Sequence, residues 1–543
     1  LNVIMYFSQP NRFLIFLAIC FLIFLTGIFE IPILDRDEAR FATASKTMLL
    51  ENEFIDIKMY DEPRYKKPVG IYWLQVASNF IFGDIPYDNI ALYRLPSIFS
   101  IFLAFIFIFF RLRKILDNEI SFLTIFFLMF SLLTLSEMLQ AKTDGALFLT
   151  IVLCNLIIYS LIENHKINYK EKLIFWGVLA IGVLIKGPII FIFTILPLII
   201  FSVIKRKNFL KEIFSFSGLI LFLILTLPWF IIITIKSNGA FWYESVGHDL
   251  LGKVSSGQES HGFPPGYYLI TTFILFWPGS ILIYPFIKKN LKQNFIRIRK
   301  HDLTFFLLIS FSVPYILFEL VSTKLPHYIY PSYLPLSILL SKFLLNENLE
   351  GISKRSLYFF TLIFPLTVVF LIYFIIAEYS EITITLAIIL IFFILQILFM
   401  IRAADIKRFK KKLINFSVFQ ISFYLILVFY VNNHIQDLWV AKRINSIIEL
   451  NKKNYDKIYN YGFEEPSLVF LTSHKSKKIS PNLLNSNNLK KERIMFIIND
   501  EFSDSITSSE KYSDFKMLKK FDGFNYSKGK TVTIKVFSNS DND

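Results

Sequence analysis

The run FLIFLAICFLIFLTGIFEIPI, residues 13–33, decides the fold class, and LDRDEARFATASKTMLLENEF, residues 34–54, follows it directly. About 20 predominantly apolar residues cross a bilayer as a helix, so the first run predicts a membrane span. It is longer than a signal-peptide core, and we expect it to stay in the membrane. Acidic and basic side chains therefore stand where the chain leaves the bilayer, which requires an explanation.

The composition indicates many further spans. The chain of 543 residues is 54% hydrophobic and only 18% charged, whereas soluble proteins carry about 25% charged residues. The net charge of +15 does not indicate nucleic acid as a partner, because Lys and Arg cluster in short loops between apolar runs. Cys20 and Cys154 lie inside apolar runs and are expected to be small core or lipid-facing residues.

About thirteen spans follow from the apolar runs at about 20 residues each. They are expected near residues 12–33, 92–110, 120–138, 145–162, 172–186, 188–204, 213–235, 266–287, 303–321, 328–345, 357–377, 382–401 and 412–432. Basic and cation-poor loops alternate between them, which predicts a cytoplasmic N-terminus. The loop at 34–91, which we expect to carry helices at the membrane surface, the loop at 236–265 and the tail then lie outside.

The tail has a different character from the rest of the chain. It is polar, with short apolar runs at 457–463, 493–499 and 531–537, the last of which alternates as a half-buried strand does. We therefore predict an α-helical polytopic membrane domain over 1–435 and a small extracytoplasmic α/β domain over 436–543. A helix is expected near 465–474. We expect this domain to be dispensable for chemistry.

Ionisable residues recur at the outer ends of the expected spans. They occur in DEPRYKKPVGIYWLQ (61–75), QAKTDGALF (140–148), LIKGP (184–188), ESVGHDLLGKVSSGQESHGFPPGYY (244–268) and STKLPHY (322–328). Charges at a membrane boundary are expensive when unpaired, so this concentration predicts a functional site near one membrane surface.

Some of these residues also have a purely structural explanation. Asp35 and Glu38 fit a capping box at the start of a helix. Asp37 would then only favour the helix dipole.

Lysines and histidines of the same segments have structural alternatives too. Lys66 and Lys67 are suited to anchoring in lipid headgroups. Asp144 and Lys142 could form a surface ion pair of small energetic value. The spacing of His248 and His261 is only a weak signal for a metal pair.

Together, the segments DRDEAR, KKPVGIYWL, KTDGALF, IKGP, PWF, SSGQESHG and STKLPHYIYPSYLPL resemble the signature segments of membrane glycosyltransferases of the GT-C fold. The most similar group is the lipid A aminoarabinose transferases, which are related to protein O-mannosyltransferases. The resemblance implies a sugar carried on a polyprenyl phosphate and transferred outside the cytoplasm. It would explain why charged residues stand where a helix leaves the bilayer, since a lipid-linked donor presents its sugar there.

Attack at an anomeric carbon needs a base for the acceptor hydroxyl and cations for the departing phosphate. We predict Asp37 as the base, with Asp144 as second candidate or orienting partner. Lys67 is the first candidate to bind the phosphate. Arg40, Lys253 and Lys324 follow it. A single displacement would invert the anomeric centre, while a second carboxylate would allow a covalent route.

Six further residues of these segments are candidates for substrate binding. They are Glu38, Tyr65, Lys186, His248, His261 and His327.

The sequence departs from the aminoarabinose transferases at two positions. The resemblance implies a metal-binding acid at the position of Lys66, together with the histidine that His261 matches. Because an ammonium cannot bind a metal ion, Lys66 disfavours the divalent metal that the resemblance implies but leaves it as an alternative. We predict no metal ligands and assign no cofactor. Phe41 stands where the transferases have Tyr, which indicates a different acceptor or sugar.

Three functions remain open at this stage. The first is sugar transfer onto a lipid A-like glycolipid at the periplasmic face of an inner membrane. The second keeps the donor but has a protein or another glycan as acceptor. The third is a lipid or solute transporter, which is disfavoured because the sequence shows no internal repeat and its unusual charges lie at the outer boundary.

Overall fold

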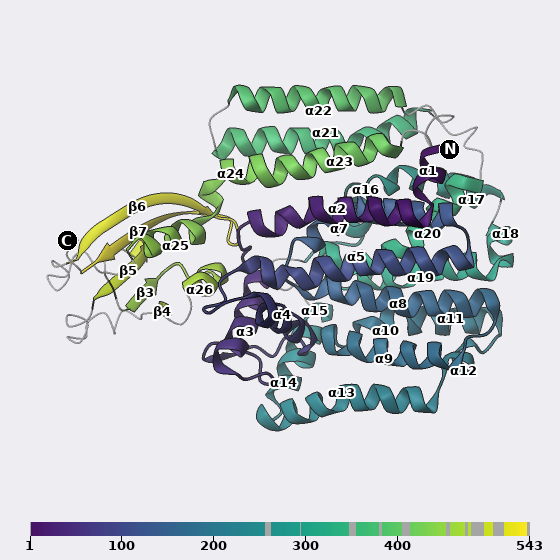
Figure 1. Ribbon diagram of the computed structural model, residues 1–543, viewed down its shortest axis with the longest axis horizontal. Coiled ribbons are helices and arrows are strands. Elements are labelled where there is room, and N and C mark those ends of the chain that lie inside the picture. Colours follow the sequence, from purple (N-terminus) through teal and green to yellow (C-terminus); the bar gives the residue numbers. More distant parts are fainter. Residues whose placement is uncertain are drawn as a thin grey trace.

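The computed structural model describes residues 2–255, 262–293, 295–346, 354–379, 383–403, 413–451, 455, 457–472, 476–478, 493–502 and 515–539. Its long helices lie side by side with nearly parallel axes, and a β-sheet forms a separate layer beyond one end of them (Figure 1). The N-terminus lies at the opposite end of the helical bundle from that sheet. The polytopic helical architecture predicted from the apolar runs is confirmed.

Among the described residues, eight helices are long and apolar enough to cross a membrane. They are α2 (Pro10–Glu30), α5 (Ile90–Ile115), α8 (Thr143–Asn164), α13 (Phe216–Lys236), α19 (Asp302–Leu320), α21 (Lys354–Tyr379), α22 (Ile384–Ala403) and α23 (Leu413–Ile426) with its continuation through η5 (Leu427–Val431) and α24 (Asn432–His434). Two bent pairs raise the number to ten: α6 (Asn118–Met129) with α7 (Leu132–Met138), at 69°, and α16 (Tyr267–Leu275) with the helix from Gly279 to Asn290, at 116°.

The remaining three expected spans are short, polar at one end or broken. They correspond to α9 (Tyr169–Lys186), to α10 (Ile189–Phe193) with α11 (Ile195–Lys205), and to η3 (Pro326–Ser332) with α20 (Tyr333–Asn346). Each of the thirteen expected regions thus contains helix, but length and composition qualify eight to ten of them. The predicted turn at 186–188 is present, and Gly187 occupies it with φ +66°, a backbone conformation that glycine adopts without strain.

The other helices are short connections. They are α1 (Asn2–Phe7), α12 (Phe209–Ile213), α14 (Ala240–Trp242), η1 (Tyr243–Leu251), α15 (Gly252–Ser255), η2 (Gly279–Leu282), α17 (Ile283–Gln293), α18 (Phe295–Lys300), η6 (Gln436–Leu438) and η10 (Asp500–Phe502).

The outer loop after α2 carries two helices, α3 (Asp37–Glu51) and α4 (Gly70–Phe82), with a small hairpin of β1 (Lys58–Met59) and β2 (Glu62–Pro63) between them. Both helices lie at the end of the bundle that faces the sheet (Figure 1). The capping box expected from Asp35 and Glu38 is wrong. Arg36 occupies the N-cap of α3 without a capping side-chain bond, and the Glu38 carboxylate accepts the Leu34 N–H at 2.8 Å.

The tail folds as an α/β unit. Strands β4 (Ser476–Lys478), β3 (Lys457–Tyr461), β5 (Ile494–Asn499), β7 (Lys530–Ser538) and β6 (Lys516–Asn525) form a sheet in that order. β3 pairs in parallel with β4 and β5, whereas β7 runs antiparallel to β5 and β6. With α25 (Val440–Leu450) and α26 (Pro466–Thr472), the sheet encloses its own apolar core. Three strands and α26 match the predicted segments, whereas α25, β4 and β6 were not predicted.

Candidate active site

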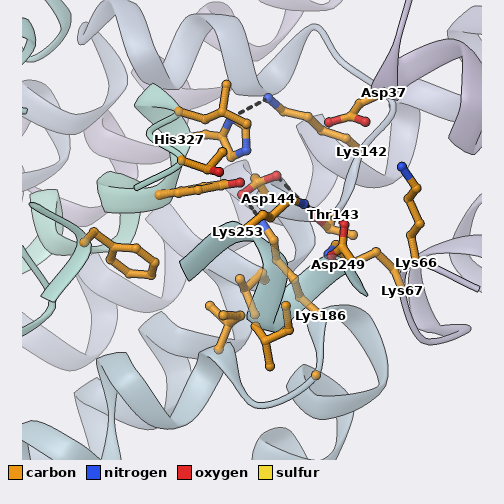
Figure 2. A pocket seen from close by; sticks show the side chains of 18 of the residues that line it. Asp37, Lys66, Lys67, Lys142, Thr143, Asp144, Lys186, Asp249, Lys253 and His327 are labelled. Atoms are coloured by element: carbon orange, nitrogen blue, oxygen red, sulfur yellow. Dashed lines mark hydrogen bonds and ion pairs between the residues drawn. The ribbon is translucent and has the colours of Figure 1, made fainter. Parts of the chain in front are cut away.

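A cavity of about 540 Å³ opens at the sheet-facing end of the helical bundle. Its wall is built from the turn before α3, the segment before α4, α7, the first turn of α8, the end of α9, η1 with α15, and η3. The ionisable lining residues are Asp35, Arg36, Asp37, Glu38, Arg64, Lys66, Lys67, Glu137, Lys142, Asp144, Lys186, Asp249, Lys253 and His327. Figure 2 shows side chains that converge from separate elements, among them Asp37, Lys66, Lys67, Lys142, Asp144, Lys186, Asp249, Lys253 and His327.

Asp144 and Lys186 form a buried ion pair in this wall. Asp144 lies in the first turn of α8, and its Oδ1 is 2.7 Å from Nζ of Lys186 at the last residue of α9. The alternative of a surface pair between Asp144 and Lys142 is therefore wrong, because Lys142 instead pairs with Glu137 at 2.9 Å. The Asp144 carboxylate therefore holds the Lys186 ammonium in position, and this contact makes it less available to accept a proton from a substrate.

Lys142 also determines the tautomer and the charge of the His327 ring. Its Nζ lies 3.4 Å from Nδ1 of His327, and an ammonium can only donate. We therefore assign the ring hydrogen to Nε2. Burial, followed by the positive charge of Lys142, lowers the pKa of His327 well below its usual value. His327 is thus a neutral donor at the wall of the cavity.

Two lysines share one carboxylate in the same cavity wall. Lys67 forms an ion pair with Asp249, and Nζ of Lys253 lies 2.7 Å from the other Asp249 oxygen. Burial would raise the pKa of Asp249, but Lys67 and Lys253 lower it to about 2. Burial lowers the pKa of Lys67 to about 8 despite Asp249. Two ammonium groups with one carboxylate leave one net positive charge, which suits an anionic ligand.

Asp37 begins α3 at the mouth of the cavity, and its side chain is 50% exposed. Burial of the carboxyl would raise its pKa, but the positive charges of Arg64, Lys142 and Arg40 lower it below its usual value. Asp37 is therefore a carboxylate at neutral pH. At neutral pH it is in the form that accepts a proton, although the lowered pKa makes it a weaker base.

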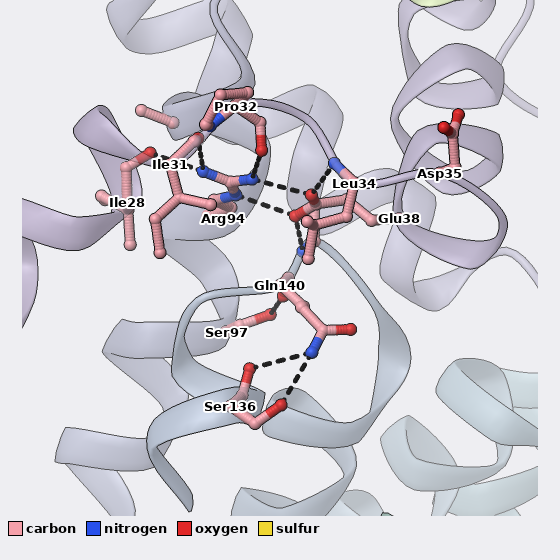
Figure 3. A network of polar contacts seen from close by, with 12 residues as sticks. Ile28, Ile31, Pro32, Leu34, Asp35, Glu38, Arg94, Ser97, Ser136 and Gln140 are labelled. Atoms are coloured by element: carbon pink, nitrogen blue, oxygen red, sulfur yellow. Dashed lines mark hydrogen bonds and ion pairs between the residues drawn. The ribbon is translucent and has the colours of Figure 1, made fainter. Parts of the chain in front are cut away.

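Glu38 belongs to a structural network instead (Figure 3). One of its oxygens accepts Nε of Arg94 and the Ala141 N–H, both at 2.8 Å. The other accepts Nη2 of Arg94 at 2.7 Å and the Leu34 N–H. Arg94 also donates to the carbonyl groups at the end of α2. Although Glu38 borders the cavity, its oxygens are engaged in joining α2, α3, α5 and the segment before α8.

Of the residues predicted from the sequence, the structure brings seven to the cavity. They are Asp37, Glu38, Lys67, Asp144, Lys186, Lys253 and His327.

Four predicted residues do not line it. Tyr65 donates its hydroxyl to Asp56 at 2.8 Å. Lys324 donates to the carbonyl groups of Phe263 and Val321, so its ammonium joins its own turn to the segment before α16. Arg40 is not part of the cavity wall, and its Nη1 lies 3.8 Å from Oδ1 of Asp37. His248 is exposed. His261 lies outside the described residues.

Seven ionisable lining residues were not predicted as site residues: Asp35, Arg36, Arg64, Lys66, Glu137, Lys142 and Asp249. Glu137 could have been predicted from the sequence, because an acidic residue within an apolar run is itself a reason to expect a functional site. Asp249 precedes Lys253 by four residues, a helical spacing that favours an ion pair. Arg64 and Lys142 stand in the charged segments already singled out.

The residues around Lys66 do not fit a divalent metal. Lys66 lines the cavity and offers only an ammonium. Within the described parts of the chain, no three His, Cys, Asp or Glu side chains come together as a ligand set.

Comparison with known proteins places this architecture. A family profile described as dolichyl-phosphate-mannose-protein mannosyltransferase matches residues 66–232. An undecaprenyl phosphate-alpha-4-amino-4-deoxy-L-arabinose arabinosyl transferase from Photorhabdus laumondii is 27% identical over 314 residues, 56% of this chain and 54% of the relative. The transferase of the same description from Yersinia enterocolitica is 27% identical over 334 residues, 59% of this chain and 58% of its own length. The matched segments thus span little more than half of these relatives.

A solved structure extends the likeness to nearly the whole chain. The crystal structure of ArnT from Cupriavidus metallidurans bound to undecaprenyl phosphate covers 97% of this chain and 98% of that one, with a TM-score of 0.72 at 15% identity. The GT-C fold and the resemblance predicted from the signature segments are confirmed. The chain is a multi-pass membrane protein.

Proposed function

We propose that this protein is a glycosyltransferase that moves a sugar from a polyprenyl phosphate onto a lipid A-like glycolipid. The observation that carries the proposal is one cavity at the bundle end where Asp37 faces the same space as the paired ammonium groups of Lys67 and Lys253. The descriptions of the relatives support the donor class and make 4-amino-4-deoxy-L-arabinose the first sugar to test.

The cations serve the leaving group in this proposal. When the bond between the anomeric carbon and the phosphate oxygen breaks, its electron pair leaves with the phosphate, and nearby cations stabilise that charge. Lys67 and Lys253 are held in place by Asp249 before any ligand arrives. Lys186, fixed by Asp144, adds a third ammonium to the wall. Such preorganisation avoids the cost of ordering these side chains during the reaction.

Asp37 serves the attacking group. The acceptor oxygen forms a bond to the anomeric carbon, its proton passes to the Asp37 carboxylate, and the polyprenyl phosphate departs. A single displacement inverts the anomeric centre. The neutral His327 is suited to donate a hydrogen bond from Nε2 to a substrate oxygen.

The orientation and the domain division are part of the proposal. We place the cavity and the α/β domain of residues 436–543 on the periplasmic side of an inner membrane, and the N-terminus of the membrane domain of residues 1–435 in the cytoplasm. The opposite positions of the N-terminus and the sheet support this topology (Figure 1), as does the alternation of basic loops. A reporter fused after Asp543 should be active only outside the cytoplasm, and cytoplasmic activity would contradict the topology.

The acceptor is decided by experiment. The mass of lipid A from cells with and without the gene should differ by one added sugar, and the purified protein should transfer sugar from an undecaprenyl phosphate donor to lipid A. A protein acceptor is the second candidate, because the family profile is described as a protein mannosyltransferase. Unchanged lipid A together with a glycosylated protein would favour that candidate. Phe41, which stands where the aminoarabinose transferases have Tyr, lines the cavity. Because the missing hydroxyl bears on which sugar or acceptor fits, both acceptors should be tested with more than one donor sugar.

A further inference from the structure

The turn before Asp37 has an unfavourable backbone. Arg36, the residue immediately before it, has φ +67° and ψ −118°. Residues other than glycine rarely adopt this combination of backbone angles. Such a conformation persists only where the surrounding structure enforces it. The position of Asp37 therefore depends on whatever holds residues 34–36.

The α/β domain supplies contacts to this turn from three positions. The Asp35 N–H donates to the Tyr526 hydroxyl at 2.7 Å, and an Asp35 carboxylate oxygen accepts the Ser467 N–H at 3.0 Å. The Arg36 guanidinium donates to the Ser527 carbonyl. These partners are more than 430 residues away in sequence. Both residues before Asp37 are thus fastened to the α/β domain.

The partners are themselves held firmly. Glu465 is buried, and its oxygens accept Nδ2 of Asn525 and the hydroxyl of Ser527, both at 2.7 Å. Asn525 and Ser527 frame Tyr526 in the turn between β6 and β7. The hydroxyl that accepts the Asp35 N–H is therefore presented by a hairpin turn whose flanking residues are held by hydrogen bonds to Glu465.

A second set of contacts joins the α/β domain to α3. Lys46 is buried, forms an ion pair with Asp88 and donates to the Phe470 carbonyl at 2.8 Å. The Phe470 ring packs edge-on against Tyr93 at 5.4 Å between ring centres. The α/β domain therefore contacts α3 both at the turn before its first residue and along its length.

We propose that the α/β domain positions the catalytic base: Tyr526, Ser467 and Ser527 hold the Asp35–Arg36 turn so that Asp37 faces the cavity. This inference rests on the proposed function insofar as Asp37 is the base. Tyr526 does not line the cavity and acts as a positioning residue. The contacts argue against the expectation that the domain is dispensable for chemistry.

The first experiment compares two Tyr→Phe variants of the full-length protein. Tyr526→Phe removes the acceptor of the Asp35 N–H. Tyr455→Phe removes a buried hydroxyl that donates to the Ile448 carbonyl within the same domain, and so is a matched control for stability. Because small misplacements of a reacting group are costly, we expect Tyr526→Phe to lower kcat about tenfold with KM within about twofold. Tyr455→Phe should leave kcat unchanged, and equal losses in both variants would overturn the proposal.

The second experiment asks whether Tyr526 acts through Asp37. Tyr526→Phe is combined with Asp37→Asn, and residual transfer is followed with a radiolabelled donor over long incubation. A residue that only positions Asp37 has nothing left to position in that background, so we expect no further loss. A full additional tenfold loss would contradict the proposal.

The third experiment does not depend on turnover. Hydrogen exchange of a peptide covering residues 34–41 should be at least about tenfold faster in Tyr526→Phe than in the wild type or in Tyr455→Phe, because the turn loses its support. Unchanged exchange would refute the positioning role. A wild type that transfers no sugar from any polyprenyl phosphate would refute the proposed function, while exchange would still decide the positioning role.

Discussion

Asp37 and Glu38 are neighbouring carboxylates in the first turn of α3, yet their surroundings differ completely. The Glu38 side chain is 1% exposed, and each of its oxygens accepts two hydrogen bonds. The Asp37 side chain is half exposed at the mouth of the cavity. Successive residues of a helix point about 100° apart, so one acid meets the bundle and the other meets the substrate space. Acid content alone does not identify a catalytic residue.

The sharpest test of this contrast is Asp37→Asn. Asparagine keeps the size of the side chain and cannot accept a proton. We expect kcat to fall by about a hundred- to ten-thousand-fold, with donor affinity and thermal stability nearly unchanged. Turnover by the purified variant with a polyprenyl phosphate sugar measures the effect. Near-normal turnover would leave Asp37 with only its place in the helix dipole.

Glu38→Gln should have the opposite effect. The new amide turns a donor toward the Arg94 guanidinium and leaves a buried charge unpaired, which costs on the order of 3 kcal/mol. Thermal unfolding in detergent should therefore shift strongly, while the folded fraction should keep turnover within a few-fold of the wild type. A stable variant without turnover would place Glu38 in the chemistry.

Lys67 and Lys66 are a second pair of neighbouring residues for which we expect different roles. Lys67→Met keeps the apolar stem but removes the charge shared with Asp249, and we expect roughly a hundredfold loss in kcat/KM, as for the removal of one stabilising group from a developing anion. Lys67→Arg should be partly active because the charge remains in a wider, planar group. Equal activity of the Met and Arg variants would show that charge at this position is not required.

The pH dependence sharpens the assignment of Lys67. Burial lowers its pKa to about 8, so the ammonium is present below that pH and lost above it. With phosphate binding dependent on the charge, kcat/KM should be level up to about pH 8 and then fall about tenfold per unit. The low pKa of Asp37 means that its base form persists throughout neutral pH. In Lys67→Arg the alkaline fall should disappear, and its persistence would assign it to another group.

The smallest effect is expected at Lys66. Lys66→Met removes one ammonium from the lining of the cavity. A single charge that acts only through the surface potential of the membrane is worth about 1 kcal/mol, so kcat/KM should change roughly fivefold or less. The same donor titration used for Lys67 measures it. A loss as large as that of Lys67→Met would mean that the segment needs general positive charge and that Lys67 has no special role.

The helical regions and the character of the tail were predictable because hydropathy and strand alternation are local properties. The breaks were harder to predict. The run at 120–138 reads as one span, whereas the chain bends by 69° between α6 and α7 and so brings Glu137 to the cavity. Nothing in a hydropathy pattern distinguishes a straight span from a bent one of the same composition.

The sequence by itself determined the helical membrane architecture, the strand-bearing tail and the set of charged segments from which a site is made, since each depends on residues close together in the chain. Only the tertiary structure decided which charges pair. Asp144 is bound to Lys186 and not to Lys142, Glu38 is taken by Arg94, and Asp35 is fastened by Tyr526 and Ser467. An ion pair or a hydrogen bond depends on a separation of about 3 Å between atoms, and only the packing of distant segments sets that distance.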